Sequence, residues 1–167
     1  MPSTLPTLAP VPDGALVLMI GPPAAGKSSL LRKVPAHQVV SLDRLRAAVS
    51  RPGDQTATAD ALVLQQQILT MRLRRGETTF ADNCSLLQGH REQLLWLARE
   101  FGRPTVAVTV DAPFDQLVLR NSARSGPERV PEDYLRTAHR LARNARHQLE
   151  REGFDEIRHY RTGSTGP

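Results

Sequence analysis

The sequence predicts a single α/β domain in which a parallel β-sheet of about five strands is covered by helices on both faces. Short apolar runs alternate along the chain with segments of helical spacing, an order typical of a parallel sheet with crossover helices. A length of 167 residues suits one domain. A glycine-containing loop follows the first apolar run. Sheets of this kind bind ligands at the carboxyl ends of their strands, where such loops lie.

The first half of the chain supplies three strands. Four prolines and no apolar period in residues 1–13 predict a flexible tail, followed by the folded domain at 14–167. The continuous apolar run 15–20 ends at a glycine and predicts a central strand buried on both faces. The elements expected after it are a helix over 27–34, a strand over 37–41, a helix from Asp43, a long helix over 57–75 and a strand over 78–81.

The second half continues the alternation. Residues 88–101 place leucines around Trp96 and stop at a glycine, so we expect an amphipathic helix with Trp96 in the core. Residues 105–110 predict the fourth strand, and Pro113 begins a further helix. Pro131 opens a last long helix that ends at Gly153, because proline favours the first turn and glycine the end. The fifth strand is expected around Ile157.

The composition excludes several classes of protein. Apolar residues make up 40% and charged residues 23%, enough for a buried core and too little charge for a wholly disordered chain. No apolar run approaches the roughly 18 residues of a membrane span, and no secretory signal is visible. Cys84 is the single cysteine, so an intrachain disulfide is impossible. We therefore expect no membrane partner and a cytoplasmic protein.

Positive charge gathers in one stretch of the chain. The net charge is +5, and residues 120–146 hold seven arginines against three acidic residues. This charge favours phosphate-bearing partners. Of 22 basic residues, only Lys27 and Lys33 are lysine, and the base composition of the genome would explain that excess of arginine equally well.

Residues 21–28, Gly-Pro-Pro-Ala-Ala-Gly-Lys-Ser, fit the phosphate-binding pattern G-x-x-x-x-G-K-[ST] directly after a predicted strand and at the start of a predicted helix. In this composition a chance match is expected about once in a thousand such chains. Backbone N–H groups and the helix N-terminus would hold phosphate, Lys27 would reach the β- and γ-phosphates, and Ser28 would hold Mg²⁺. The predicted triphosphate contacts are Gly21, Ala24, Ala25, Gly26, Lys27, Ser28 and Ser29.

A carboxylate and an arginine follow the second predicted strand. Asp43 would lie at its carboxyl end and could accept the proton of an attacking hydroxyl. Arg46 is three residues further, on the same helix face, and could bind an anionic acceptor. The alternative is that Ser41 or Asp43 merely caps the helix.

Two arginines precede a segment broken by glycine and proline. Arg120 and Arg124 are four residues apart, so on a helix they project on one side, and the segment after them could close over bound triphosphate. The alternative is a solvated basic helix face. Cys84 has no partner at metal-ligand spacing, which favours a small, half-buried residue.

These motifs, together with Asp82-Asn-Cys-Ser85, resemble the 5′-polynucleotide kinase family of P-loop kinases. The likeness is greatest to the kinase module of bacterial RNA end-healing polynucleotide kinase/phosphatase enzymes, and it extends over residues 15–153. It implies transfer of the γ-phosphate of ATP, with Mg²⁺, to a polynucleotide 5′-hydroxyl. Asp43 would be the general base, Arg46 the ligand of an acceptor phosphate, and Asp82 an aid to Mg²⁺ or arginine orientation. Arg120 and Arg124 would be lid residues on the donor phosphates, joined by Arg129.

Three departures from the family pattern stand out. Ala24 occupies a position where the family often has glycine, and Pro22-Pro23 stiffens the turn. Asn83-Cys84-Ser85 replaces the family's x-Thr-Asn after the aspartate, which affects acceptor positioning. The length leaves no room for phosphatase and ligase modules, so we expect a stand-alone kinase.

Two other functions remain open on the sequence. The same loop, base and lid could phosphorylate a hydroxyl of a small molecule, such as a metabolite, a nucleoside or an antibiotic. A non-catalytic module in which bound ATP only orders the lid is the third reading. Few aromatic residues, 4% of the chain, argue against extended single-strand binding.

Overall fold

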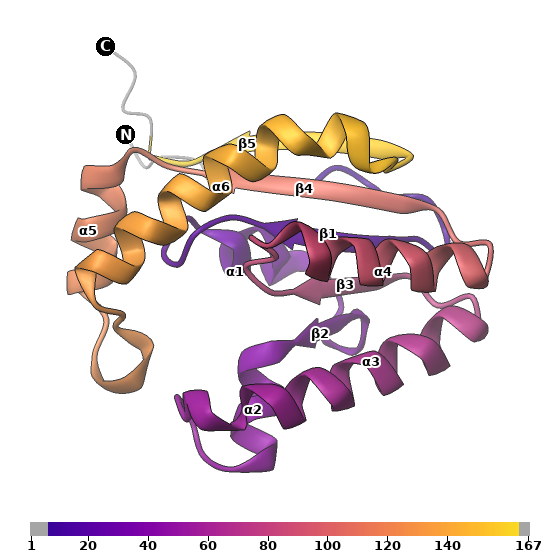
Figure 1. Ribbon diagram of the computed structural model, residues 1–167, viewed down its shortest axis with the longest axis horizontal. Coiled ribbons are helices and arrows are strands. Elements are labelled where there is room, and N and C mark those ends of the chain that lie inside the picture. Colours follow the sequence, from indigo (N-terminus) through magenta and orange to yellow (C-terminus); the bar gives the residue numbers. More distant parts are fainter. Residues whose placement is uncertain (1–6, 164–167) are drawn as a thin grey trace.

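A computed structural model describes residues 7–163 of the chain and shows one five-stranded sheet, all parallel, in the order β2-β3-β1-β4-β5 (Figure 1). The strands are β1 (Leu16–Ile20), β2 (Val39–Ser41), β3 (Thr79–Asp82), β4 (Thr105–Asp111) and β5 (Glu156–Arg161). The predicted fold class is thereby confirmed. Because the strands are parallel, their carboxyl ends share one edge, where Ser41 of β2 lies in register with Asp82 of β3.

Six α-helices connect the strands within the described range. They are α1 (Lys27–Leu30), α2 (Leu42–Val49), α3 (Thr58–Arg74), α4 (Gln88–Glu100), α5 (Phe114–Ser122) and α6 (Glu132–Glu152). The first is shorter than predicted, since α1 passes into a 3-10 turn, Leu31–Lys33. Val34 is extended because the proline after it disfavours helical backbone. Likewise β2 starts at Val39, after a 3-10 turn, Ala36–Gln38.

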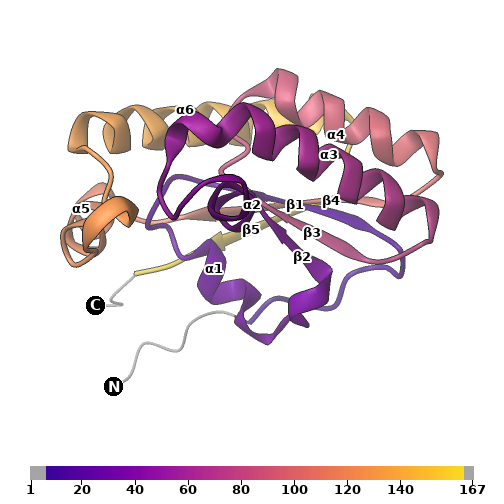
Figure 2. The ribbon, with the colours of Figure 1, turned by 90° about the horizontal axis from the view of Figure 1, so that it is seen from below.

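Alternate side chains of β1 serve the two faces of the sheet. Leu16, Leu18 and Ile20 pack with leucines and alanines of α3, α4 and α6. Val17 and Met19 point the other way, toward α1, α5 and the start of α6. Figure 2 shows α3, α4 and α6 together above the sheet and α1 below it. Both faces are covered, which explains why the strand is apolar at every position.

Trp96 is not in the core, contrary to expectation. Its side chain is 59% exposed, whereas Leu94, Leu95, Leu97 and Ala98 of the same helix are buried. At 3.6 residues per turn these four positions define one side of α4 and Trp96 lies on the other. The apolar cluster was recognised correctly, but its centre was placed on the wrong residue.

The described part of the amino-terminal segment lies against the domain. Residues 7–13 form no helix or strand, but Leu8 and Val11 pack against the core. The Arg158 guanidinium of β5 donates to the carbonyl oxygens of Ala9 at 2.7 Å and Pro10 at 2.8 Å. The rest of the expected flexible tail, residues 1–6, and the last four residues of the expected domain lie outside the described range.

None of the helices in residues 7–163 combines the length and the apolar character that crossing a membrane requires.

Candidate active site

The loop between β1 and α1 curves back on itself at the carboxyl edge of the sheet. It begins at Gly21, where a Cβ would lie 2.3 Å from the carbonyl oxygen of Val110 on β4. The Lys27 ammonium donates to the carbonyl oxygens of Gly21 and Pro22, both at 2.8 Å, so it is held inside the curve. Only glycine permits this close approach to β4, and the approach sets the path of the loop.

The remaining residues of the loop determine which backbone N–H groups are available to bind phosphate. Pro22 and Pro23 have no backbone N–H, so the N–H groups available to phosphate begin at Ala24. Ala24 has φ of 64°, in the left-handed region that favours glycine, which is the residue the family often has there. Ser28 is exposed and Ser29 half-buried at the start of α1. The predicted contact residues thus share one short curve of backbone.

Arg120 of α5 supports this curve from its outer side. One guanidinium nitrogen donates to the carbonyl oxygen of Ala24 at 3.2 Å and to the hydroxyl of Thr162 at 2.8 Å. Thr162, just beyond β5, donates in turn to the carbonyl oxygen of Ala25 at 2.7 Å. The fifth strand is thereby tied to the phosphate loop through one threonine and one arginine. Sequence spacing did not indicate this role for Thr162.

Asp43 and Arg46 form an ion pair on the exposed side of α2. The Asp43 side chain is 84% exposed and that of Arg46 only 12%, so the carboxylate faces solvent while the guanidinium is covered. The Arg46 Nε is buried without a hydrogen-bond partner among the described residues. Ser41, at the N-cap, makes no side-chain capping bond, whereas Asp43 is the acidic residue in the first turn of the helix.

Asp82 connects this pair with the phosphate loop. Burial raises the pKa of Asp82, the nearby charge of Asp43 raises it further, and Lys27 and Arg44 oppose the shift. These effects place Lys27, Asp43 and Asp82 in one electrostatic neighbourhood. In the sheet β3 lies between β2 and β1, so Asp82 ends the strand that separates the strand before Asp43 from the strand before Lys27.

The loop after β3 is fixed by two buried polar contacts. The side-chain amides of Gln65 and Asn83 bond reciprocally, at 2.8 and 2.9 Å, which ties the loop to α3. Arg91 is fully buried; it donates to the carbonyl oxygen of Ser85 at 2.9 Å and pairs with Glu152 of α6. The loop in turn supports the phosphate-binding curve, because the Gly21 N–H donates to the carbonyl oxygen of Cys84 at 3.0 Å.

The lid is the segment between α5 and α6. Asn121 links the two ends of this segment. Its side-chain amide donates to the carbonyl oxygen of Val130 at 2.8 Å and accepts a hydrogen bond from the Val130 N–H at 3.0 Å. Since α5 ends at Ser122, Arg124 lies beyond the helix and does not share a helix face with Arg120, contrary to expectation. Its guanidinium donates to the carbonyl oxygen of Glu128 within the lid at 3.3 Å. Arg129 is exposed.

Tyr134, in the first turn of α6, was not singled out by the sequence analysis. It is 51% exposed. Burial of part of the ring raises the pKa of its hydroxyl, the charges of Cys84 and Asp43 raise it further, and Arg46 opposes the shift. The hydroxyl therefore senses both charges of the α2 ion pair. The sequence showed an aromatic residue in the first turn of α6, but its distance along the chain from Asp43 gave no reason to group the two residues.

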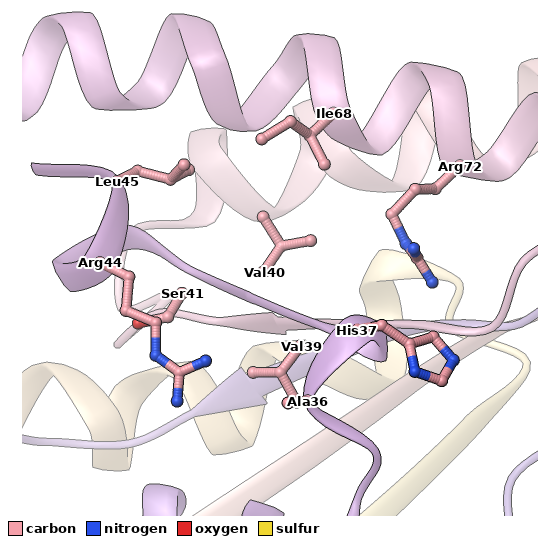
Figure 3. Close-up of a pocket in the computed structure, with 9 residues that line it drawn as sticks. All are labelled: Ala36, His37, Val39, Val40, Ser41, Arg44, Leu45, Ile68 and Arg72. Carbon is pink, nitrogen blue, oxygen red and sulfur yellow. The ribbon is translucent and has the colours of Figure 1, made fainter. Parts of the chain in front are cut away.

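A shallow hollow of about 220 Å³ runs beside β2 at the edge of the sheet. Figure 3 shows Val40, Leu45 and Ile68 lining it, with the side chains of His37 and Arg44 beside them. Residues of the phosphate loop do not line it. The hollow is therefore separate from the phosphate-binding curve.

Comparisons with known proteins agree with this geometry. Residues 16–149 match the family described as AAA domain, AAA_33. The AvrRxo1-ORF1:-ORF2 structure with ATP superposes with a TM-score of 0.72 at 16% identity, covering 92% of this chain and 56% of that one. A protein from Chloroflexus aurantiacus J-10-fl assigned as a kinase gives 0.63 at 15% identity, with 89% and 88% covered. The Pnkp1/Rnl/Hen1 RNA repair complex gives 0.68 at 15% identity, with 81% and 46% covered.

At these identities the structural likeness establishes the fold, and the chain spans only about half the length of the AvrRxo1-ORF1 and Pnkp1-complex chains. No curated protein sequence matches the chain. The family match, by contrast, covers most of the residues, from the start of β1 to the last turn of α6. By family and by fold, therefore, the chain is a member of the AAA domain family with the architecture of a P-loop kinase.

Proposed function

We propose that the protein is an ATP-dependent phosphotransferase that moves the γ-phosphate of ATP to the 5′-hydroxyl end of a polynucleotide. The observation that carries the proposal is the Asp43–Arg46 ion pair in the helix that follows β2, with its carboxylate exposed and its guanidinium covered. A solvent-exposed carboxylate suits a general base, and an adjacent covered cation suits an anionic acceptor.

The donor side is the curve of residues 21–28. Its backbone N–H groups and the start of α1 favour phosphate, and the Lys27 ammonium, now bonded to loop carbonyls, would turn to the β- and γ-phosphates. The lid arginines, Arg124 and Arg129, would neutralise the transferred group as the lid closes. Arg120 would keep the loop in shape through its contacts with Ala24 and Thr162.

The residues present fit Mg²⁺. This ion prefers oxygen ligands and binds through few protein groups together with substrate phosphates, and the exposed Ser28 hydroxyl and the Asp82 carboxylate are oxygen donors on this edge. Ser28 would hold the ion and Asp82 would orient it. When bound with the nucleotide, Mg²⁺ neutralises phosphate charge.

The acceptor side of the proposed site would activate the 5′-hydroxyl for attack on the γ-phosphate. Asp43 takes the proton of the 5′-hydroxyl, the hydroxyl oxygen forms a bond to the γ-phosphorus, and the bond from that phosphorus to the β-γ bridging oxygen breaks, releasing ADP. Arg46 would bind the phosphate that follows the terminal nucleoside. A polynucleotide is favoured over an uncharged alcohol because Arg46 could bind a phosphate group that only the polynucleotide carries. The positive charge that gathers over residues 120–146 favours the same acceptor.

The test is transfer of label from γ-labelled ATP and Mg²⁺ to short 5′-OH oligonucleotides, DNA and RNA in parallel, with free nucleosides as competing acceptors. We expect labelled oligonucleotides with the wild type and a loss of at least about a hundredfold in kcat with Asp43→Asn, with ATP affinity retained. Asp115→Asn, an exposed aspartate of α5, is the matched control and should remain active. Label in nucleosides but never in oligonucleotides would reassign the acceptor to a small molecule. ATP binding without any transfer would leave only a nucleotide-binding module.

A further inference from the structure

Helix α3 carries exposed apolar side chains on the side opposite its buried residues. Ala61, Gln65, Leu69 and Leu73 are buried against the sheet and α2. On the opposite side Val63 is 57% and Met71 53% exposed. A helix that serves only to cover a sheet needs one apolar side, with polar residues on the other. The exposed apolar side chains of α3 therefore need an explanation.

The exposed side forms one narrow stripe along the whole helix, here called the outer face of α3. At 100° per residue its members fall within an arc of about 120°. Figure 1 shows α3 along the lower margin of the molecule. The outer face consists of Asp60, Val63, Leu64, Gln67, Met71, Arg74 and Arg75, all exposed.

The order of residue types along the outer face is self-complementary. Asp60 lies at its amino end and Arg74 at its carboxyl end, each seven residues from Gln67, and Val63 and Met71 each lie four residues from Gln67. Within residues 7–163, neither Asp60 nor Arg74 takes part in an ion pair. Both charges are therefore free to pair with another molecule.

We infer that the outer face of α3 is the two-fold interface of a homodimer. An antiparallel pair of α3 helices with Gln67 on the axis sets Asp60 opposite Arg74 of the partner subunit and Val63 opposite Met71 of the partner subunit. The two-fold axis repeats each contact, as a closed symmetric interface requires. A second copy is the occupant because one chain supplies both halves of the charge pattern, acid at one end and base at the other.

The interface is one helix wide, smaller than the 1,200–2,000 Å² or so of a standard interface. The dimer is consequently reversible and concentration-dependent. This inference does not depend on the reaction that the protein performs, since the outer face contains none of the residues assigned to the site.

Sedimentation equilibrium of the wild type tests the inference between about 5 and 500 µM. The weight-average mass should rise from the monomer value of 18.4 kDa toward twice that value. Asp60→Arg or Arg74→Asp alone should weaken the dimer by about tenfold, because each places like charges opposite one another twice. The double variant Asp60→Arg/Arg74→Asp should restore the wild-type dimerisation constant. A partner other than a second copy would show no such rescue.

The apolar contacts have a matched control. Met71→Lys should abolish the dimer, whereas Gln66→Lys adds the same charge at an exposed position outside the stripe and should leave the dimer intact. Circular dichroism should show unchanged folding, since all of these side chains are exposed. A wild type that stays at 18.4 kDa at 500 µM, a double charge swap without recovery, or equal effects of the two lysine variants would each overturn the inference.

Disulfide crosslinking of cysteine variants tests the antiparallel alignment of the two helices. Gln67→Cys places a thiol on the proposed axis and should form a disulfide-linked dimer under mild oxidation. Gln66→Cys should not, and the native Cys84 is present in both variants. Crosslinking by Gln66→Cys and not by Gln67→Cys would refute the antiparallel arrangement.

Discussion

Gly53, in the loop between α2 and α3, abuts Pro127 at the tip of the lid: a Cβ on Gly53 would lie 1.8 Å from the Cβ of Pro127. The segment between α5 and α6 thus reaches the loop between α2 and α3. Gly53 also has φ of 79°. Its lack of a side chain permits both the turn and the contact.

Gly53→Ala should push the lid away from the loop. Gly102→Ala is the matched control, because Gly102 also has a left-handed φ, 59°, but has open space around it. Both variants should lose about 1 kcal/mol of stability to the backbone conformation. Only Gly53→Ala should speed trypsin cleavage at Arg124 and Arg129, by about fivefold, since an open lid exposes these bonds. Equal cleavage of the two variants would show that the contact does not hold the lid.

Thr162 connects β5, Arg120 and the phosphate loop, so Thr162→Val should loosen the loop at nearly constant side-chain volume. The substitution removes a donor and an acceptor from a buried position and should cost about 1–3 kcal/mol in urea unfolding. ATP affinity should fall with it. Thr137→Val, on the exposed side of α6, should change neither quantity. Unchanged ATP affinity in Thr162→Val would show that Thr162 does not support ATP binding by the loop.

The sequence predicted those features that depend on local pattern. The phosphate loop and the apolar strands follow from residue order alone, and the Asp43–Arg46 contact follows from helical spacing. The prediction that Arg120 and Arg124 share a helix face was wrong, because α5 ends at Ser122. A helix end is set by local competition between conformations and is often misplaced by a residue or two.

Contacts between distant segments were beyond the reach of spacing arguments. Thr162 meets Arg120 and the carbonyl oxygen of Ala25 although these residues lie far apart in the sequence. Asn83 stands at an unrestricted position of the family pattern, so the pattern gave it no role, whereas the structure shows that it serves as the partner of Gln65. Such pairs depend on tertiary packing, and no property of either residue alone indicates them.

Tyr134 should contribute to acceptor binding, provided the proposed function is correct. Its ring is half-exposed, so the terminal base of a polynucleotide could stack on it, and stacking contributes about 1–3 kcal/mol per base. Tyr134→Ala should raise the KM for the oligonucleotide about tenfold or more with kcat little changed. Tyr134→Phe should behave as the wild type. Trp96→Ala, which removes the exposed aromatic of α4, is the control, and a KM effect equal to that of Tyr134→Ala would contradict the assignment.

Gln65 and Asn83 should show strong coupling in a double-mutant cycle. Each amide satisfies the other in a buried setting, so Gln65→Ala or Asn83→Ala leaves a buried amide unpaired and should cost about 1–3 kcal/mol. The double variant should cost less than the sum of the two by about 1 kcal/mol. Urea unfolding measures all four corners, and strictly additive losses would show that the pair does not act as a unit.

Asp82 should make stability fall as pH rises from acid. Burial raises the pKa of Asp82 above its ordinary value of 3.8 in the folded state, so the folded protein binds this proton more tightly than the unfolded chain. Stability therefore declines between 3.8 and the raised folded pKa and stays lower above it. Asp82→Asn should unfold at higher urea than the wild type at pH 7, and the difference should vanish below pH 3.8, where both chains carry a neutral side chain. Asp115→Asn is the exposed control. A less stable Asp82→Asn at pH 7 would mean that attraction to Lys27 outweighs the cost of burying the carboxylate.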